Sequence, residues 1–152
     1  MNKAFVKEDD DIAERLPDRA VSPHPNLVTA KGLALIGQLI GKLKEEQDGA
    51  KSEADSHALA RIARDLRYWN ARQATAQLTE PSPGDTVQFG STVTFRRMDG
   101  RTLSYRIVGI DEADPAKGTL SYVSPAAQAL LGREVGEEIE IGGVRAEITG
   151  LS

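Results

Sequence analysis

Residues 124–137 read SPAAQALLGREVGE, and this stretch decides the fold of the C-terminal half. Ser124 is a good helix N-cap because its hydroxyl can accept an orphan backbone N–H, and proline is favoured at the first helical position, here Pro125. Gly132 is the residue type that ends helices. The stretch therefore predicts a short helix from Pro125 to Leu131.

The residues around this helix predict strands, because apolar and polar side chains alternate with a period of two. Val87 and Phe89 begin the alternation, and Asp99-Gly100 is a typical hairpin turn. The strands that we expect after Phe89 cover residues 92–98, 102–108, 119–123, 138–141 and 144–148. The prediction is a small, mostly antiparallel sheet with one short helix packed on it.

The middle of the chain shows helical rather than strand periodicity. Thr29 can cap a helix that starts near Ala30, which we expect to run over residues 30–48 and to end at Gly49. Apolar positions spaced three and four apart form two coiled-coil stripes. These positions are Leu33, Ile36, Ile40 and Leu43 in the first stripe, and Leu59, Ile62, Leu66, Trp69, Gln73 and Ala76 in the second. Since a polar break over residues 51–56 separates them, we expect an antiparallel helical hairpin.

Three parts of the chain follow from these patterns. Residues 1–28 carry an acidic run, Glu8–Asp11, and two prolines two residues apart, Pro23 and Pro25, which forbid a helix there. We expect an irregular arm over residues 1–28, the coiled-coil hairpin over 29–80 and the sheet domain over 81–152, with a Pro- and Gly-rich boundary after residue 80. The fold class is α+β.

The composition excludes several classes of function. The net charge of −4 gives no global signature of nucleic-acid binding, and the absence of cysteine excludes disulfides and thiolate metal sites. No apolar run approaches the ~18 residues of a membrane helix, and no apolar signal core follows the N-terminus. His24 and His57 are isolated, so a metal site held by this chain alone is not expected. These features fit a cytoplasmic protein that binds no membrane.

Two segments carry a resemblance to a known family. They are Tyr105-Arg106-Ile107-Val108-Gly109 with the following Asp111–Asp114, and residues 124–137 with Ser124-Pro125, Leu130-Leu131-Gly132 and Val135-Gly136. In order and spacing they resemble the C-terminal domain of the bacterial Gre-type (GreA/GreB) transcription elongation factors, over residues 85–152. The resemblance implies an FKBP-like α+β domain and bacterial RNA polymerase as the partner.

The resemblance also implies roles for particular residues. Ser124 and Pro125 correspond to the loop that contacts the polymerase near its secondary channel, although the acidic residue that usually precedes this pair is Val123 here. In the family, basic residues on the second helix attract RNA, so the resemblance gives Arg61, Arg64, Arg67 and Arg72 an RNA-proximal role. Their alternative role is that of solvated, helix-paired surface charges.

The hairpin tip decides whether such a factor stimulates RNA cleavage. The family's tip pattern is Gly-Asp-x-x-Glu-Asn, whose two carboxylates hold a Mg²⁺ shared with the polymerase. Here Gly49 and Glu53 fit, but the first acidic position is Ala50 and the asparagine position is Ala54. Asp48 or Asp55 could substitute, and a different register places Glu45 and Asp48 three apart. The other interpretation is a solvated polar turn without metal chemistry.

These observations lead to one hypothesis with alternatives. We expect a polymerase-binding elongation factor, not itself an enzyme, that docks at the secondary channel, meets nascent RNA only indirectly and modulates elongation without strong transcript cleavage. It would carry no cofactor of its own, apart from a Mg²⁺ shared with the polymerase, and would be a monomer. The alternatives are an active cleavage stimulator using the tip carboxylates, and a relative of the Rnk-type regulators of nucleoside diphosphate kinase. Prolyl isomerisation is disfavoured because the sheet domain has few aromatic residues.

Overall fold

The structure, a computed structural model, describes residues 15–152 and contains two compact units. Within the described residues, one unit comprises residues 15–23 and 34–75, and the other comprises residues 24–33 and 76–152. Residues 24–33, which the sequence divides between arm and hairpin, thus group with the sheet domain. The acidic run Glu8–Asp11 lies outside the described residues.

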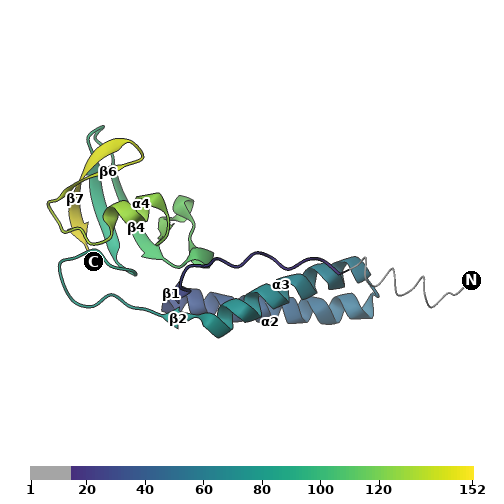
Figure 1. Cartoon of the computed structure of the whole chain (residues 1–152). Coiled ribbons are helices and arrows are strands. Elements are labelled where there is room, and N and C mark those ends of the chain that lie inside the picture. The colour runs from purple at the N-terminus through teal and green to yellow at the C-terminus, as the bar shows by residue number, and fades with distance from the viewer. Residues whose placement is uncertain (1–14) are drawn as a thin grey trace, which may run out of the picture. The chain divides into compact units, whose positions relative to one another are not determined.

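The helical part is an antiparallel hairpin, as the two stripes predict. Helix α2 (Ala30–Ser52) and helix α3 (Ser56–Thr75) lie side by side in Figure 1. Their facing apolar side chains are the predicted ones, with Ile36, Ile40 and Leu43 buried on α2 and Ile62 and Leu66 buried on α3. Neither helix could keep such a stripe in water alone, so mutual burial stabilises both.

The ends of the hairpin differ from the prediction. Helix α2 does not end at Gly49 but continues to Ser52, so its 23 residues span about 34 Å. Ala50 is buried and extends the first stripe by two further turns. On α3 the second stripe is shorter than predicted, because Gln73 is exposed and Ala76 lies beyond the end of the helix.

The segment before the hairpin contains no helix from residue 15 to residue 26, as the prolines require. It ends in a two-residue strand that the sequence did not predict, β1 (Leu27–Val28), which pairs in parallel with β2 (Gln77–Leu78). Backbone N–H groups of Gln77 and Thr79 donate to the carbonyls of Asn26 and Val28. The chain before α2 is thereby joined to the chain after α3.

The sheet has five strands in the order β5-β4-β3-β7-β6. Their bounds are β3 (Thr92–Arg97), β4 (Thr102–Val108), β5 (Thr119–Ser121), β6 (Glu138–Ile141) and β7 (Val144–Leu151). All pairs are antiparallel except β4 with β5, whose connection holds two 3₁₀ turns, η1 (Ile110–Glu112) and η2 (Pro115–Lys117). The predicted α+β class is confirmed.

The alternation at Val87 and Phe89, which began the strand-like pattern, does not lie in a strand. Only Thr86 makes an isolated bridge, to Glu134, yet Val87 and Phe89 are both buried. A tight turn explains this, since Gly90 has φ of +87° and the Ser91 hydroxyl accepts the Gln88 N–H at 3.0 Å. Burial in a loop produced the same pattern that burial on a strand would give.

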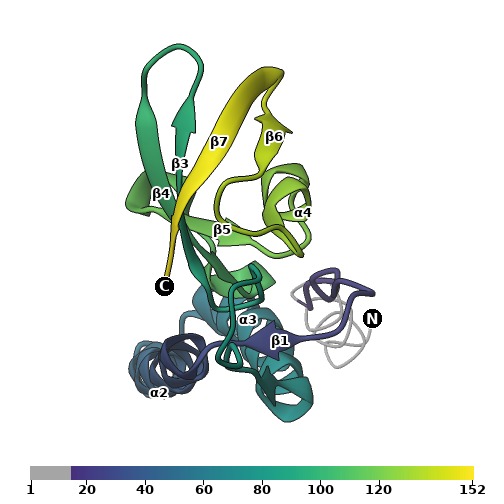
Figure 2. The ribbon, with the colours of Figure 1, turned by 90° about the vertical axis from the view of Figure 1, so that its left-hand side faces the viewer.

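The short helix α4 (Pro125–Leu130) completes the domain. It contacts both β5 and β6, the two edge strands, so the sheet is curled around a common core (Figure 2). Phe95, Ile107, Leu130 and Ile148 are fully enclosed in that core. Within residues 15–152, no helix combines the length and apolar character that a membrane crossing needs.

Candidate functional site

The loop that leads into α4 has the local structure that its sequence predicts. The Ser124 hydroxyl accepts the Ala127 N–H at 3.2 Å, and Pro125 occupies the first helical turn. The Gln128 side chain donates to the Tyr122 carbonyl at 2.7 Å, which fixes the loop from the other side. Pro125 is exposed while Val123 and Ser124 are half-buried. The helix cap therefore presents the Pro125 ring to solvent on a rigid support.

The hairpin tip is a tight turn made by Glu53, Ala54 and Asp55. Ala54 has φ of +53°, and the Asp55 N–H donates to the Ala50 carbonyl at 3.0 Å. The Asp55 carboxylate accepts the Ala58 N–H at 3.1 Å, so it acts as the cap of α3. One of the proposed substitute ligands is thus engaged in holding the helix start.

The remaining tip carboxylates are exposed to solvent. Glu45, Glu46, Asp48 and Glu53 are all exposed, and Glu46 faces Arg61 at 3.9 Å. Ala50, at the position where the family pattern has an acidic residue, is 7% exposed. No group of three acidic or histidine side chains that could hold a metal occurs among residues 15–152. The tip as described is thus an exposed polar turn around a buried Ala50.

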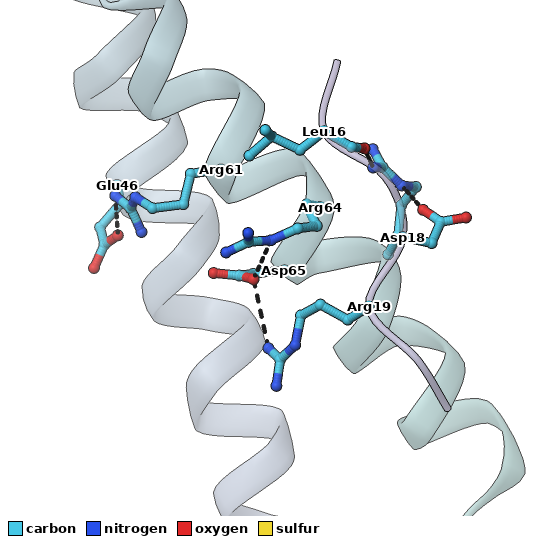
Figure 3. A network of polar contacts seen from close by, with 8 residues as sticks. Leu16, Asp18, Arg19, Glu46, Arg61, Arg64 and Asp65 are labelled. Carbon is cyan, nitrogen blue, oxygen red and sulfur yellow. Dashed lines mark hydrogen bonds and ion pairs between the residues drawn. The ribbon is translucent and has the colours of Figure 1, made fainter. Parts of the chain in front are cut away.

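The basic residues of α3 are engaged to different degrees (Figure 3). Arg64 Nε donates to Asp65 at 3.1 Å, and Arg67 Nε donates to Asp18 at 2.5 Å. Arg61 makes a long contact to Glu46 at 3.9 Å. Arg72 is 1% exposed, so the prediction that groups it with the RNA-proximal surface residues is wrong about its position. The candidate surface is therefore reduced to Arg61, Arg64 and Arg67.

One constellation was not predicted as a site and binds the start of α2 to the sheet domain. We call it the Glu112 clamp, consisting of Glu112, Thr29, Gly32 and Gly109. Glu112 Oε2 accepts the N–H groups of Thr29 at 3.0 Å and Gly109 at 3.2 Å, and its other oxygen accepts the Thr29 hydroxyl. The Thr29 hydroxyl in turn accepts the Gly32 N–H at 3.0 Å, which confirms the predicted cap.

Both glycines of the clamp are approached closely by other groups. A Cβ at Gly32 would lie 2.2 Å from Glu112 Oε2, and a Cβ at Gly109 would lie 2.4 Å from the Leu27 carbonyl oxygen. The carboxylate also sits at the positive end of α2, where an anion is favoured. The only signal in the sequence was that Glu112 belongs to the Asp111–Asp114 segment, whose resemblance gave no reason for its charge.

Comparison with known proteins identifies the family. Residues 81–149 match the family "Transcription elongation factor, GreA/GreB, C-term". The chain is 40% identical to the transcription elongation factor GreA of Desulfovibrio desulfuricans over 129 residues, which cover 76% of this chain and 77% of that protein. The chain belongs to the GreA/GreB family. With GreA of Rhizobium leguminosarum bv. trifolii it shares 37% identity over 147 residues, 93% of this chain and 87% of that protein.

Two solved structures of related proteins are also similar. Gfh1 of Thermus thermophilus aligns with 85% of this chain and 99% of its own, at 21% identity and a TM-score of 0.43. A GreA/GreB factor of Nitrosomonas europaea aligns with 84% of this chain and 98% of its own, at 22% identity and a TM-score of 0.42.

The match to the GreA/GreB family covers some of the residues described above and leaves others outside. The matched segment 81–149 contains the whole five-stranded sheet except the last residues of β7, together with α4 and the capped Ser124-Pro125 loop. The Glu112 clamp joins this segment to residues outside it, Thr29 and Gly32.

Proposed function

We propose that this GreA/GreB-type factor binds bacterial RNA polymerase near its secondary channel through the Ser124-Pro125 loop. One observation carries the proposal: the family match includes this loop, and the loop holds an exposed Pro125 on a doubly hydrogen-bonded support. A rigid, exposed apolar ring costs little entropy on binding, which suits a contact residue. Val123 in place of an acidic residue removes one charge from the edge of this surface.

The second part of the proposal is that the hairpin modulates elongation without strongly stimulating transcript cleavage. The tip supports this, because Ala50 is buried, Asp55 caps α3, and the described tip carboxylates belong to no group of three that could hold a metal. The factor itself would then be an accessory protein, and any Mg²⁺ at the tip would be shared with the polymerase.

The binding part is tested by pull-down of bacterial core RNA polymerase with the tagged full chain. We expect association at micromolar protein, lost in Pro125→Glu. The matched control is Pro115→Glu, because Pro115 is also exposed at the first position of a short helical turn in the same unit. If both variants bound the polymerase equally, the Ser124-Pro125 loop would not be the contact surface. If the unaltered chain did not bind, RNA polymerase would not be the partner.

The cleavage part is tested on backtracked elongation complexes with Mg²⁺. We expect no transcript shortening at protein concentrations that saturate binding. Shortening that disappears in Glu53→Gln would instead establish the alternative, an active cleavage stimulator. Capture of nucleoside diphosphate kinase without polymerase would favour the Rnk-like alternative.

A further inference from the structure

The described part of the N-terminal segment, residues 15–23, lies against α3 as an extended strap. Arg67 is held from the strap by two contacts, one from Nε to Asp18 at 2.5 Å and one from Nη2 to the Leu16 carbonyl at 2.9 Å. Arg19 Nη1 reaches Asp65 at 3.4 Å. These contacts join residues 46 to 51 positions apart in the sequence.

The strap also covers an aromatic surface of α3. The guanidinium of Arg19 lies 4.0 Å from the ring centroid of Tyr68 and 5.6 Å from that of Trp69. The two rings are edge to face at 5.0 Å. Leu16 lines a shallow groove of 270 Å³ together with Leu59, Ala60, Ala63 and Arg67. The strap therefore places a carboxylate on an arginine and a planar cation on an aromatic ring.

The contacts of the strap with Arg67 and Tyr68 resemble the contacts that proteins make with single-stranded nucleic acid. Proteins bind single-stranded nucleic acid by placing arginines on the phosphates and aromatic rings against the bases. The Asp18 carboxylate occupies the arginine fork that a phosphate oxygen would use, and the flat Arg19 guanidinium occupies the ring face on which a base would stack. Arg61 and Arg64 lie on the same helix; Arg61 makes an exposed contact to Glu46, and Arg64 makes a contact to the neighbouring Asp65.

We propose that residues 15–23 are an internal occupant of a single-strand-binding face on α3, and that RNA must displace them from Arg67 and Tyr68. We name RNA as the displacing ligand because the family resemblance gives the α3 arginines a role close to RNA. The strap contacts are individually weak, because the Asp18 side chain is 70% exposed and the Arg67 side chain 34% exposed. A weak occupant is what a displaceable cover requires, since it can be outcompeted without unfolding the hairpin.

The affinity test uses the full chain and a fluorescein-labelled 12-nucleotide oligouridylate in an anisotropy titration at low salt. Asp18→Asn is expected to tighten binding by about threefold, within the range of an exposed ion pair. The matched control is Asp85→Asn, because Asp85 is exposed, lies in the other unit and changes the net charge equally. In an Arg67→Gln background, Asp18→Asn is expected to lose its effect, since the residue that it uncovers is absent.

A second measurement follows the strap directly through Trp69, the single tryptophan of the chain. Saturating oligouridylate is expected to shift the Trp69 emission, and Arg19→Gln to shift it without RNA while the far-UV circular dichroism stays unchanged.

Four outcomes overturn the proposal. Asp18→Asn and Asp85→Asn could tighten binding equally, Asp18→Asn could act equally in the Arg67→Gln background, RNA could bind with unchanged Trp69 emission, or no variant could bind RNA. Each of them leaves the polymerase pull-down unaffected, so failure of this proposal is distinguishable from failure of the proposed function.

Discussion

The two ends of helix α2 are built in opposite ways. At its start, Thr29 and Gly32 contact Glu112, a carboxylate 83 residues away in the sequence from Thr29. At its other end, the turn over Glu53–Asp55 is closed by hydrogen bonds to residues within a few positions, and the acidic side chains around it are exposed. The start of α2 is held by contacts to a residue distant in the sequence and leaves no room for a larger side chain at Gly32. The end of α2 is a turn closed by local hydrogen bonds, with exposed side chains.

The largest effect that this comparison predicts is that of Gly32→Ala. The new methyl would force the Glu112 carboxylate away from three donors, the Thr29 N–H, the Thr29 hydroxyl and the Gly109 N–H. We expect the free energy of unfolding to fall by about 2–3 kcal/mol, measured by urea denaturation. In a Glu112→Ala background the same substitution should be neutral or slightly stabilising, because the clashing group is gone and alanine favours a helix over glycine. A full cost in that background would contradict the clamp.

Glu112→Gln probes the charge of the clamp while keeping its shape. The amide retains one acceptor oxygen but loses the second, and the hydrogen bonds are no longer charge-assisted. We expect a loss of about 1–2 kcal/mol in the free energy of unfolding. Thr29→Ser, which keeps the hydroxyl, serves as the control and should lose much less. Equal stability of Glu112→Gln and the unaltered protein would mean that the charge at the start of α2 contributes nothing.

The same two ends show what the sequence could and could not predict. The start of α2 was predicted correctly at Ala30 because a Thr N-cap is local chemistry. Its end was misplaced at Gly49, since a helical glycine costs only about 1 kcal/mol and the burial of Ala50 one residue later offsets it. The strand positions of the sheet followed from period two, except at Val87 and Phe89, where a buried loop gives the same alternation.

The features of the candidate site also differ in whether local sequence could predict them. The Ser124 cap and the exposed Pro125 are local and were predictable. The pairing of Arg67 with Asp18, the burial of Arg72 and the pairing of β1 with β2 depend on residues about 50 positions apart or on the whole packed unit. Glu112 is a charged residue in a short 3₁₀ turn, and nothing local distinguishes it from its acidic neighbours.

A smaller effect is expected at the free end of the hairpin. Asp55→Ala removes the acceptor of the Ala58 N–H at the start of α3, so the free energy of unfolding should fall by about 1 kcal/mol. Glu53→Ala is the matched control, because Glu53 is exposed in the same turn, and it should change stability by less than about 0.5 kcal/mol. If Mg²⁺ at millimolar concentration raised the melting temperature of the unaltered protein but not of Asp55→Ala, Asp55 would be a ligand rather than a cap.

The smallest expected effect is a gain in stability, and it comes from another glycine-to-alanine substitution in α2. Gly49→Ala adds a methyl at a helical position where nothing lies within 4 Å, and the Gly49 carbonyl already accepts the Glu53 N–H at 3.1 Å. Alanine loses less conformational freedom in a helix, so we expect the free energy of unfolding to rise by about 0.5–1 kcal/mol. A loss of stability would show that Gly49 is needed as the helix stop that the sequence first indicated. A gain, beside the loss at Gly32, would establish that one helix carries a glycine selected for contact at one end and a replaceable one at the other.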